Sequence, residues 1–210
     1  MLGLNIDPAA IIAVAIMLLI GFPVHEFSHA LAAYRLGDGT AKMFGRLTLN
    51  PIVHFDPIGG LLLIISALGT GFFFGWAKPT PVNPMNLQGG RRGEAIVALA
   101  GPASNMIMAA AVAIPVRFAY GATGIPPMVI DVLEYFVLIN VFLAIFNLIP
   151  IPPLDGYRVL LGLIDPRTAW QIRPVLEQYG FIILLVFLFT VGGRIIGGIG
   201  VEIFRLLVGR

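Results

Sequence analysis

The sequence contains no cysteine and few charged residues. The absence of cysteine excludes disulfides, thiol catalysis and thiolate metal sites. Charged residues make up 11% of the 210 residues, whereas soluble domains carry roughly a quarter. Hydrophobic residues make up 58%, and the mean hydropathy is +0.94. This composition predicts a multi-pass protein of the cell membrane, and a net charge of +2 is too small to suggest a nucleic-acid partner.

The N-terminal region lacks the features of a cleaved signal peptide. No basic segment precedes the first apolar run, and no small-residue cleavage site follows it. This run is therefore expected to remain as a membrane span. The sequence also lacks internal repeats and low-complexity tracts. We expect one domain over residues 1–210.

Several apolar runs are long enough to cross a bilayer, which takes about 20 residues. The 25 glycines and 16 prolines are compatible with such helices, because neighbouring helices can satisfy the freed backbone groups. Spans are expected over residues 9–34, 94–118 and 129–149, with a last one from Tyr179 to about Arg194, followed by an interfacial helix over 195–208. The predicted fold is an all-α polytopic membrane protein, a bundle of about four to six membrane segments.

Two further segments have other expected structures. Residues 58–74 are apolar, but they are few and rich in glycine, so we expect this segment to re-enter the membrane or lie along its surface. Residues 40–49 alternate in polarity between turn residues, which predicts a small β-hairpin at the membrane surface.

A zinc-protease pattern lies inside the first predicted span. His25 and His29 are four residues apart, so on a helix they lie one turn apart on the same face and can point at one ion. Glu26 lies beside them and can hold a metal-bound water. In the H-E-x-x-H pattern the two histidines bind the metal and the glutamate acts on this water. The alternative is a pair of buried, hydrogen-bonded histidines, but Glu26 would then be a buried charge without an evident partner. Because such groups are costly in hydrocarbon, a catalytic Zn²⁺ explains them best.

A catalytic zinc usually has three protein ligands, so a third one must come from another part of the chain. His54 is the only other histidine. Among the carboxylates, only Asp155 is expected at membrane depth. It follows the proline-rich break at residues 150–153, where irregular backbone must be packed in protein or line a wet cavity. Zn²⁺ with Asp155 and Glu26 ionised would sum to zero charge.

These motifs resemble those of the site-2 proteases, which are intramembrane zinc metalloproteases. Besides H-E-x-x-H, residues 147–156 resemble the family's N-x-x-P…L-D-G motif, and residues 101–105 resemble its G-P-x-x-N element. The resemblance implies that Asp155 is the third zinc ligand and Glu26 the general base. It also implies that Asn147 orients or polarises the substrate. No segment between the motifs is long enough for a PDZ domain, and no CBS pair fits after them, so a compact form is expected.

The expected function is hydrolysis of peptide bonds in transmembrane protein substrates within the lipid bilayer. Zinc would activate the water, and Glu26 would act as general base. The alternative is a zinc-binding membrane transporter or sensor without hydrolytic activity. Transport requires polar groups on both sides of the bilayer midplane, whereas this sequence concentrates them at one site. The sequence carries no signal for an oligomeric state.

The position of the motifs also constrains topology. Both ligand motifs lie past the middle of their apolar runs, so these two helices are expected to run in the same direction. An odd number of crossings must then separate them, and residues 94–118 supply one. Lys42 and Arg46 favour a cytoplasmic location for the loop after the first span, with the site nearer that face.

Overall fold

The structure, a computed structural model, describes residues 7–69, 75–120 and 124–209. Its described part is helical and contains no strand. The elements in chain order are α1 (Pro8–Ile16), η1 (Met17–Gly21), α2 (Phe22–Arg35), α3 (Thr40–Met43), α4 (Pro51–His54), α5 (Pro57–Gly69), η2 (Pro84–Asn86), α6 (Arg91–Ala119), α7 (Pro127–Asn147), α8 (Asp155–Leu163), α9 (Pro166–Phe187), η3 (Leu188–Gly192) and α10 (Gly193–Val208).

Four helical stretches of the described chain are long and apolar enough to cross a membrane. They are Pro8–Arg35, Arg91–Ala119, Pro127–Asn147 and Pro166–Val208. Two of these stretches contain a π-helical turn, η1 or η3, and continue through it. The prediction of an all-α bundle is therefore confirmed, at the lower end of the expected number of segments.

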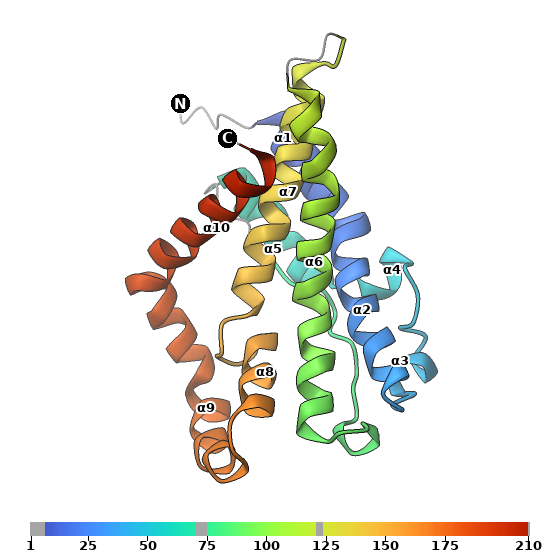
Figure 1. Ribbon diagram of the computed structural model, residues 1–210, viewed down its shortest axis with the longest axis vertical. Coiled ribbons are helices and arrows are strands. Elements are labelled where there is room, and N and C mark those ends of the chain that lie inside the picture. Colours follow the sequence, from blue (N-terminus) through green and yellow to red (C-terminus); the bar gives the residue numbers. More distant parts are fainter. Residues whose placement is uncertain (1–6, 70–74, 121–123, 210) are drawn as a thin grey trace.

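The last helical stretch does not end near Arg194, where a span was predicted to end and an interfacial helix to begin. At 43 residues, about 65 Å at 1.5 Å per residue, this helix is roughly twice as long as the hydrocarbon core, so the end of the span stays a prediction. The helix that begins at Pro166 bends through η3 and continues to Val208 (Figure 1). Gly192 and Gly193 keep right-handed helical angles, with φ of −61° and −58°. These glycines therefore do not end the helix, and membrane helices tolerate them there.

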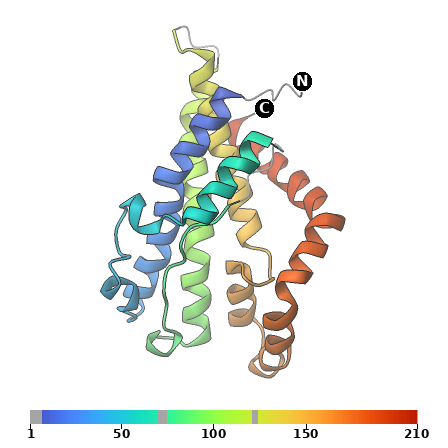
Figure 2. The same cartoon turned by 180° about the vertical axis from the view of Figure 1, so that it is seen from behind.

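The predicted topology agrees with the observed arrangement. In Figures 1 and 2, α2 and α7 run in the same direction along the bundle, and α6 runs in the opposite direction between them in sequence. The helix α5 has 13 residues, about 20 Å at 1.5 Å per residue, which is shorter than the roughly 30 Å hydrocarbon core. It lies against α1, and it is not among the described helices that are long enough to cross a membrane. The last part of the segment expected over 58–74 lies outside the described residues.

The predicted β-hairpin over residues 40–49 is wrong. Residues 40–43 form the short helix α3, and Gly45, with φ of +68°, turns the chain after it. The Asp38 carboxylate accepts hydrogen bonds from Thr40 N and Oγ1, which starts a helical turn instead of a strand. The Arg46 side chain is buried and donates to the carbonyl of Val53, so it is not an outward position on a hairpin.

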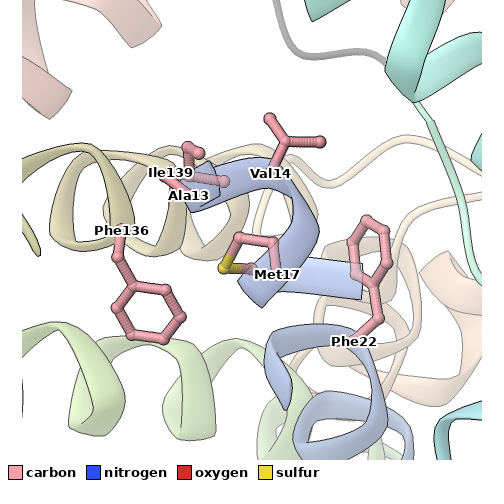
Figure 3. Packing of buried hydrophobic residues seen from close by; sticks show 6 residues of the cluster. All are labelled: Ala13, Val14, Met17, Phe22, Phe136 and Ile139. Atoms are coloured by element: carbon pink, nitrogen blue, oxygen red, sulfur yellow. The ribbon is translucent and has the colours of Figure 1, made fainter. Parts of the chain in front are cut away.

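The core places α6 at the centre of the bundle, where it packs against α2, α7 and α8. Small buried residues on α6, among them Ala98, Gly101 and Ala109, allow these close approaches. A second region of the core joins the first span to α7. Figure 3 shows its side chains: Ala13, Val14, Met17, Phe22, Phe136 and Ile139.

Candidate metal centre

The structure brings His25, His29 and Asp155 together. The two imidazole Nε2 atoms are 3.1 Å apart, and each lies 3.3 Å from Asp155 Oδ2. The histidines are buried on α2, and the Asp155 side chain is 21% exposed at the start of α8. Ligand atoms about 2.0–2.1 Å from a tetrahedral zinc would be roughly 3.3 Å apart, so the spacing of these three atoms fits the ion.

The chain returns to the end of α7 just before Asp155, and this close return places the carboxylate beside the two histidines. Helix α7 ends at Asn147, and Leu154 is extended, with φ −75° and ψ 157°, so that α8 begins at Asp155. A Cβ on Gly156 would lie 2.2 Å from the carbonyl oxygen of Leu148. Only glycine allows this close return of the backbone to the end of α7.

The hydrogen bond at the far side of His29 fixes which nitrogen can bind a metal. His29 Nδ1 lies 2.7 Å from the backbone oxygen of Val97. A carbonyl oxygen only accepts, so Nδ1 carries the hydrogen, and in the neutral ring the Nε2 lone pair is bare. That lone pair faces Asp155 Oδ2, which is also an acceptor. Acceptors that converge in this way fit a cation between them.

Gly101 of α6 lies directly against the two imidazoles. A Cβ at this position would be 2.3 Å from His29 Nε2 and 2.6 Å from His25 Nε2. Real Cβ contacts are not this short, so the backbone of α6 borders the site without a side chain. The space that this glycine leaves is next to the candidate ligand atoms.

Glu26 is held by a segment that lies far away in the sequence. Its Oε2 accepts a hydrogen bond of 2.8 Å from Thr80 N, and its backbone oxygen accepts one of 3.0 Å from Thr80 Oγ1. Thr80 lies between Pro79 and Pro81, which have no N–H, so its own N–H is the only backbone donor of this tripeptide. Sequence analysis missed Thr80, although the Pro-Thr-Pro pattern was a usable signal.

Known proteins resemble this chain over most of its length. The model of peptidase family M50 matches residues 115–191. YwhC of Bacillus subtilis, a predicted zinc metalloprotease, is 39% identical over 180 residues, which are 83% of this chain and 79% of YwhC. Rip2 of Mycolicibacterium smegmatis, also a predicted zinc metalloprotease, is 33% identical over 192 residues, 89% of this chain and 71% of Rip2. No solved structure matches the chain.

The chain belongs to peptidase family M50, the site-2 proteases. It is an intramembrane zinc metalloprotease, and zinc is its cofactor. Membership of a peptidase family favours hydrolysis over the alternative, a zinc-binding transporter or sensor without hydrolytic activity. Within the described residues, His25, His29 and Asp155 form the one group that could hold the ion.

Two other candidate site residues of this site-2 protease, Asn147 and His54, make their hydrogen bonds elsewhere. The Asn147 side chain donates a 3.0 Å hydrogen bond to the carbonyl of Leu143 at the end of α7. Among the described hydrogen bonds, none joins it to the three candidate ligands. His54, the other histidine left open as a third ligand, is on α4 with its Nε2 2.8 Å from Thr48 O, and it is not part of the group around Asp155.

Proposed function

We propose that His25, His29 and Asp155 hold the catalytic zinc and that Glu26 is the general base for peptide-bond hydrolysis. The observation that carries this proposal is the convergence of two Nε2 atoms and Asp155 Oδ2, 3.1 to 3.3 Å apart, with Glu26 in the same helical turn. The substrates are transmembrane proteins, and the cell membrane is the site of action. Residues 1–210 act as a single protease domain.

The reaction needs a proton acceptor and donor beside the metal. When bound, zinc would supply Lewis-acid chemistry and would lower the pKa of the attacking water. Glu26 takes the proton of the attacking water and delivers it to the leaving amine. The Thr80 N–H holds Oε2, which fixes the carboxylate and leaves its other oxygen for this transfer. Asn147 would support the developing oxyanion once the substrate is bound.

The charges of the site suit a location among membrane helices. Zn²⁺ balances the ionised Asp155 and Glu26, so the loaded site has no net charge. An unpaired charge in such surroundings would be expensive. The same balance favours a divalent ion over a monovalent one at this position.

The substitution Glu26→Gln tests the proposed base. In proteoliposomes, the variant is expected to bind one zinc per chain and to lose cleavage of a transmembrane substrate by at least about 100-fold, because general-base catalysis contributes ~10²–10⁴-fold. Zinc content by mass spectrometry and product formation by gel would be measured together. Cleavage at the rate of the unsubstituted protein would rule out Glu26 as the base.

A further inference from the structure

Two buried asparagines connect the centre of the bundle to His25. Asn105 on α6 and Asn140 on α7 are both 0% exposed. Asn105 Oδ1 lies 2.6 Å from His25 Nδ1, and Asn105 Nδ2 donates to Asn140 Oδ1 at 3.2 Å. In the sequence, Asn105 is marked only as the last residue of the G-P-x-x-N element at residues 101–105, and nothing marks Asn140. Amides at such depth are costly unless they are hydrogen-bonded, so both have a structural or chemical role.

The orientation of the Asn140 amide follows from its other neighbours. Its Nδ2 lies 2.9 Å from the carbonyl oxygen of Phe136 and 3.1 Å from the sulfur of Met17. Both are acceptors only, so a flipped amide would place Oδ1 against them and lose both contacts. Asn140 must therefore present Oδ1 to Asn105. Figure 3 shows the side chains of Met17 and Phe136 in the core between the first span and α7.

The orientation of Asn140 determines that of Asn105, and then the tautomer of His25. Since Asn140 offers an acceptor, Asn105 must turn its Nδ2 towards it and its Oδ1 towards His25. The ring then carries its hydrogen on Nδ1 and keeps a bare lone pair on Nε2, which is the atom facing Asp155. The hydrogen-bond chain thus has one direction, from His25 Nδ1 to Asn105 and on to Asn140.

We infer that Asn105 and Asn140 are positioning residues that hold His25 in its metal-binding tautomer. Without them, the Nε2–H tautomer would gain a hydrogen bond to Asp155 Oδ2, 3.3 Å away, and the proton would occupy the position needed by zinc. His29 does not depend on this chain, because a backbone carbonyl fixes its Nδ1. This inference rests on the proposed function in taking His25 as a ligand.

The experiment uses the three histidines of the full-length chain as reporters. Protein labelled with ¹⁵N-histidine is freed of metal with a chelator, and the tautomer of each ring is read by NMR, with assignments from single histidine substitutions. Native protein should show His25 protonated at Nδ1. In Asn105→Leu, His25 should move towards the Nε2–H tautomer while His29 is unchanged. Zinc affinity, measured by chelator competition, should fall about 10- to 100-fold.

Three more variants separate positioning from packing. Asn140→Leu should shift the tautomer equilibrium of His25 in the same direction, but by less. In this variant Asn105 can still contact His25, and only the fixed orientation of its amide is lost. Asn105→Asp keeps an acceptor for Nδ1, and as the neutral acid its O–H can donate to Asn140 Oδ1 as the amide does, so it should retain the native tautomer and zinc affinity. Ser104→Ala removes a neighbouring buried hydrogen bond to Gly101 O without touching His25, so it should change neither readout.

Several results would overturn the inference. One is a folded Asn105→Leu protein with native His25 tautomer and zinc affinity. Another is a change in the His25 tautomer in Ser104→Ala that is as large as the change in Asn105→Leu. Such a result would mean that any loss of packing on α6 shifts the tautomer. If Asn105→Leu does not fold, loss of the native tautomer in Asn105→Asp would contradict it. The tautomer is measured without metal, so failure here differs from failure of the Glu26→Gln test, which concerns cleavage.

Discussion

At Gly101, the backbone of α6 reaches the imidazoles of His25 and His29 with no side chain between them. This contact explains why a glycine lies on the helix face that borders the candidate ligands. It also means that the smallest possible side chain would move the ligand nitrogens. The site therefore requires the absence of a Cβ at position 101 as well as the candidate ligands themselves.

Gly101→Ala should weaken zinc binding by about 100-fold. Changes to groups that orient metal ligands cost ~10–100-fold in affinity, and here the candidate ligand atoms themselves must shift. The measurement is chelator competition on purified protein. Gly197→Ala is the matched control, since a Cβ at Gly197 meets nothing within 4 Å. Equal zinc affinity in the two variants would show that α6 does not border the ion.

Among the elements, the segment that carries Thr80 is tied to the end of α2 by Asp38. This fully buried carboxylate accepts hydrogen bonds from Asn83 N at 2.7 Å and from Asn86 Nδ2 at 3.1 Å, in addition to those from Thr40. Burial raises the pKa of Asp38, but the hydrogen bonds from Thr40, Asn83 and Asn86 outweigh it and hold the pKa below the ordinary value of 3.8. Asp38 thereby helps to keep Thr80 beside Glu26.

Asp38→Asn should lower the free energy of unfolding by about 2 kcal/mol at neutral pH, because hydrogen bonds to a charged acceptor contribute roughly 1.5–3 kcal/mol. Since the folded pKa is lowered, the native stabilisation is present above pH 4 and is lost as the pH falls through the folded pKa. Thermal unfolding of the detergent-solubilised protein at several pH values measures both effects. Asp131→Asn, at an exposed position, is the control. An acid transition that is the same in Asp38→Asn and native protein would contradict this account.

Sequence analysis predicted the candidate ligands but not the groups that hold them. His25 and His29 are recognised by their four-residue spacing, and Asp155 by the proline-rich break in the apolar sequence before it. Both features are visible in the sequence alone. Thr80 is 54 residues from Glu26 and Asn140 is 35 residues from Asn105. Those pairs meet only in the folded chain, where the non-helical segment with Thr80 lies against α2 and α7 packs against α6. The hairpin prediction failed because the local hydrogen bonds from Thr40 to Asp38 outweighed a weak alternation. The helix continues past Arg194 because glycine does not always end a membrane helix.

For the whole molecule, the direction of the spans places the candidate site in the half of the bundle where α2 ends and α6 begins. That end also carries many of the basic residues, among them Arg35, Lys42, Arg91, Arg92 and Arg167. Positive charge marks the cytoplasmic side of membrane proteins, so this distribution supports a site nearer the cytoplasm. The bent helix Pro166–Val208 is more peripheral, since 17% of its apolar window is buried, against 39% in each other span.

The absence of cysteine makes this orientation testable. In intact cells, a membrane-impermeant maleimide should label Met128→Cys at the start of α7 and leave Lys42→Cys unlabelled. Both native side chains are exposed, so reactivity reports the side of the membrane. After permeabilisation, both variants should react. The opposite pattern in intact cells would reverse the proposed orientation.

X-ray absorption at the zinc edge of the purified protein tests whether His25, His29 and Asp155 are the zinc ligands. We expect one zinc per chain with two imidazole nitrogens and carboxylate or water oxygen at about 2.0–2.2 Å. In Asp155→Ala, both imidazoles should remain while the affinity falls, and His54→Gln should leave the spectrum unchanged. A third imidazole that disappears in His54→Gln, or a native site with a single imidazole, would contradict the assignment of His25, His29 and Asp155.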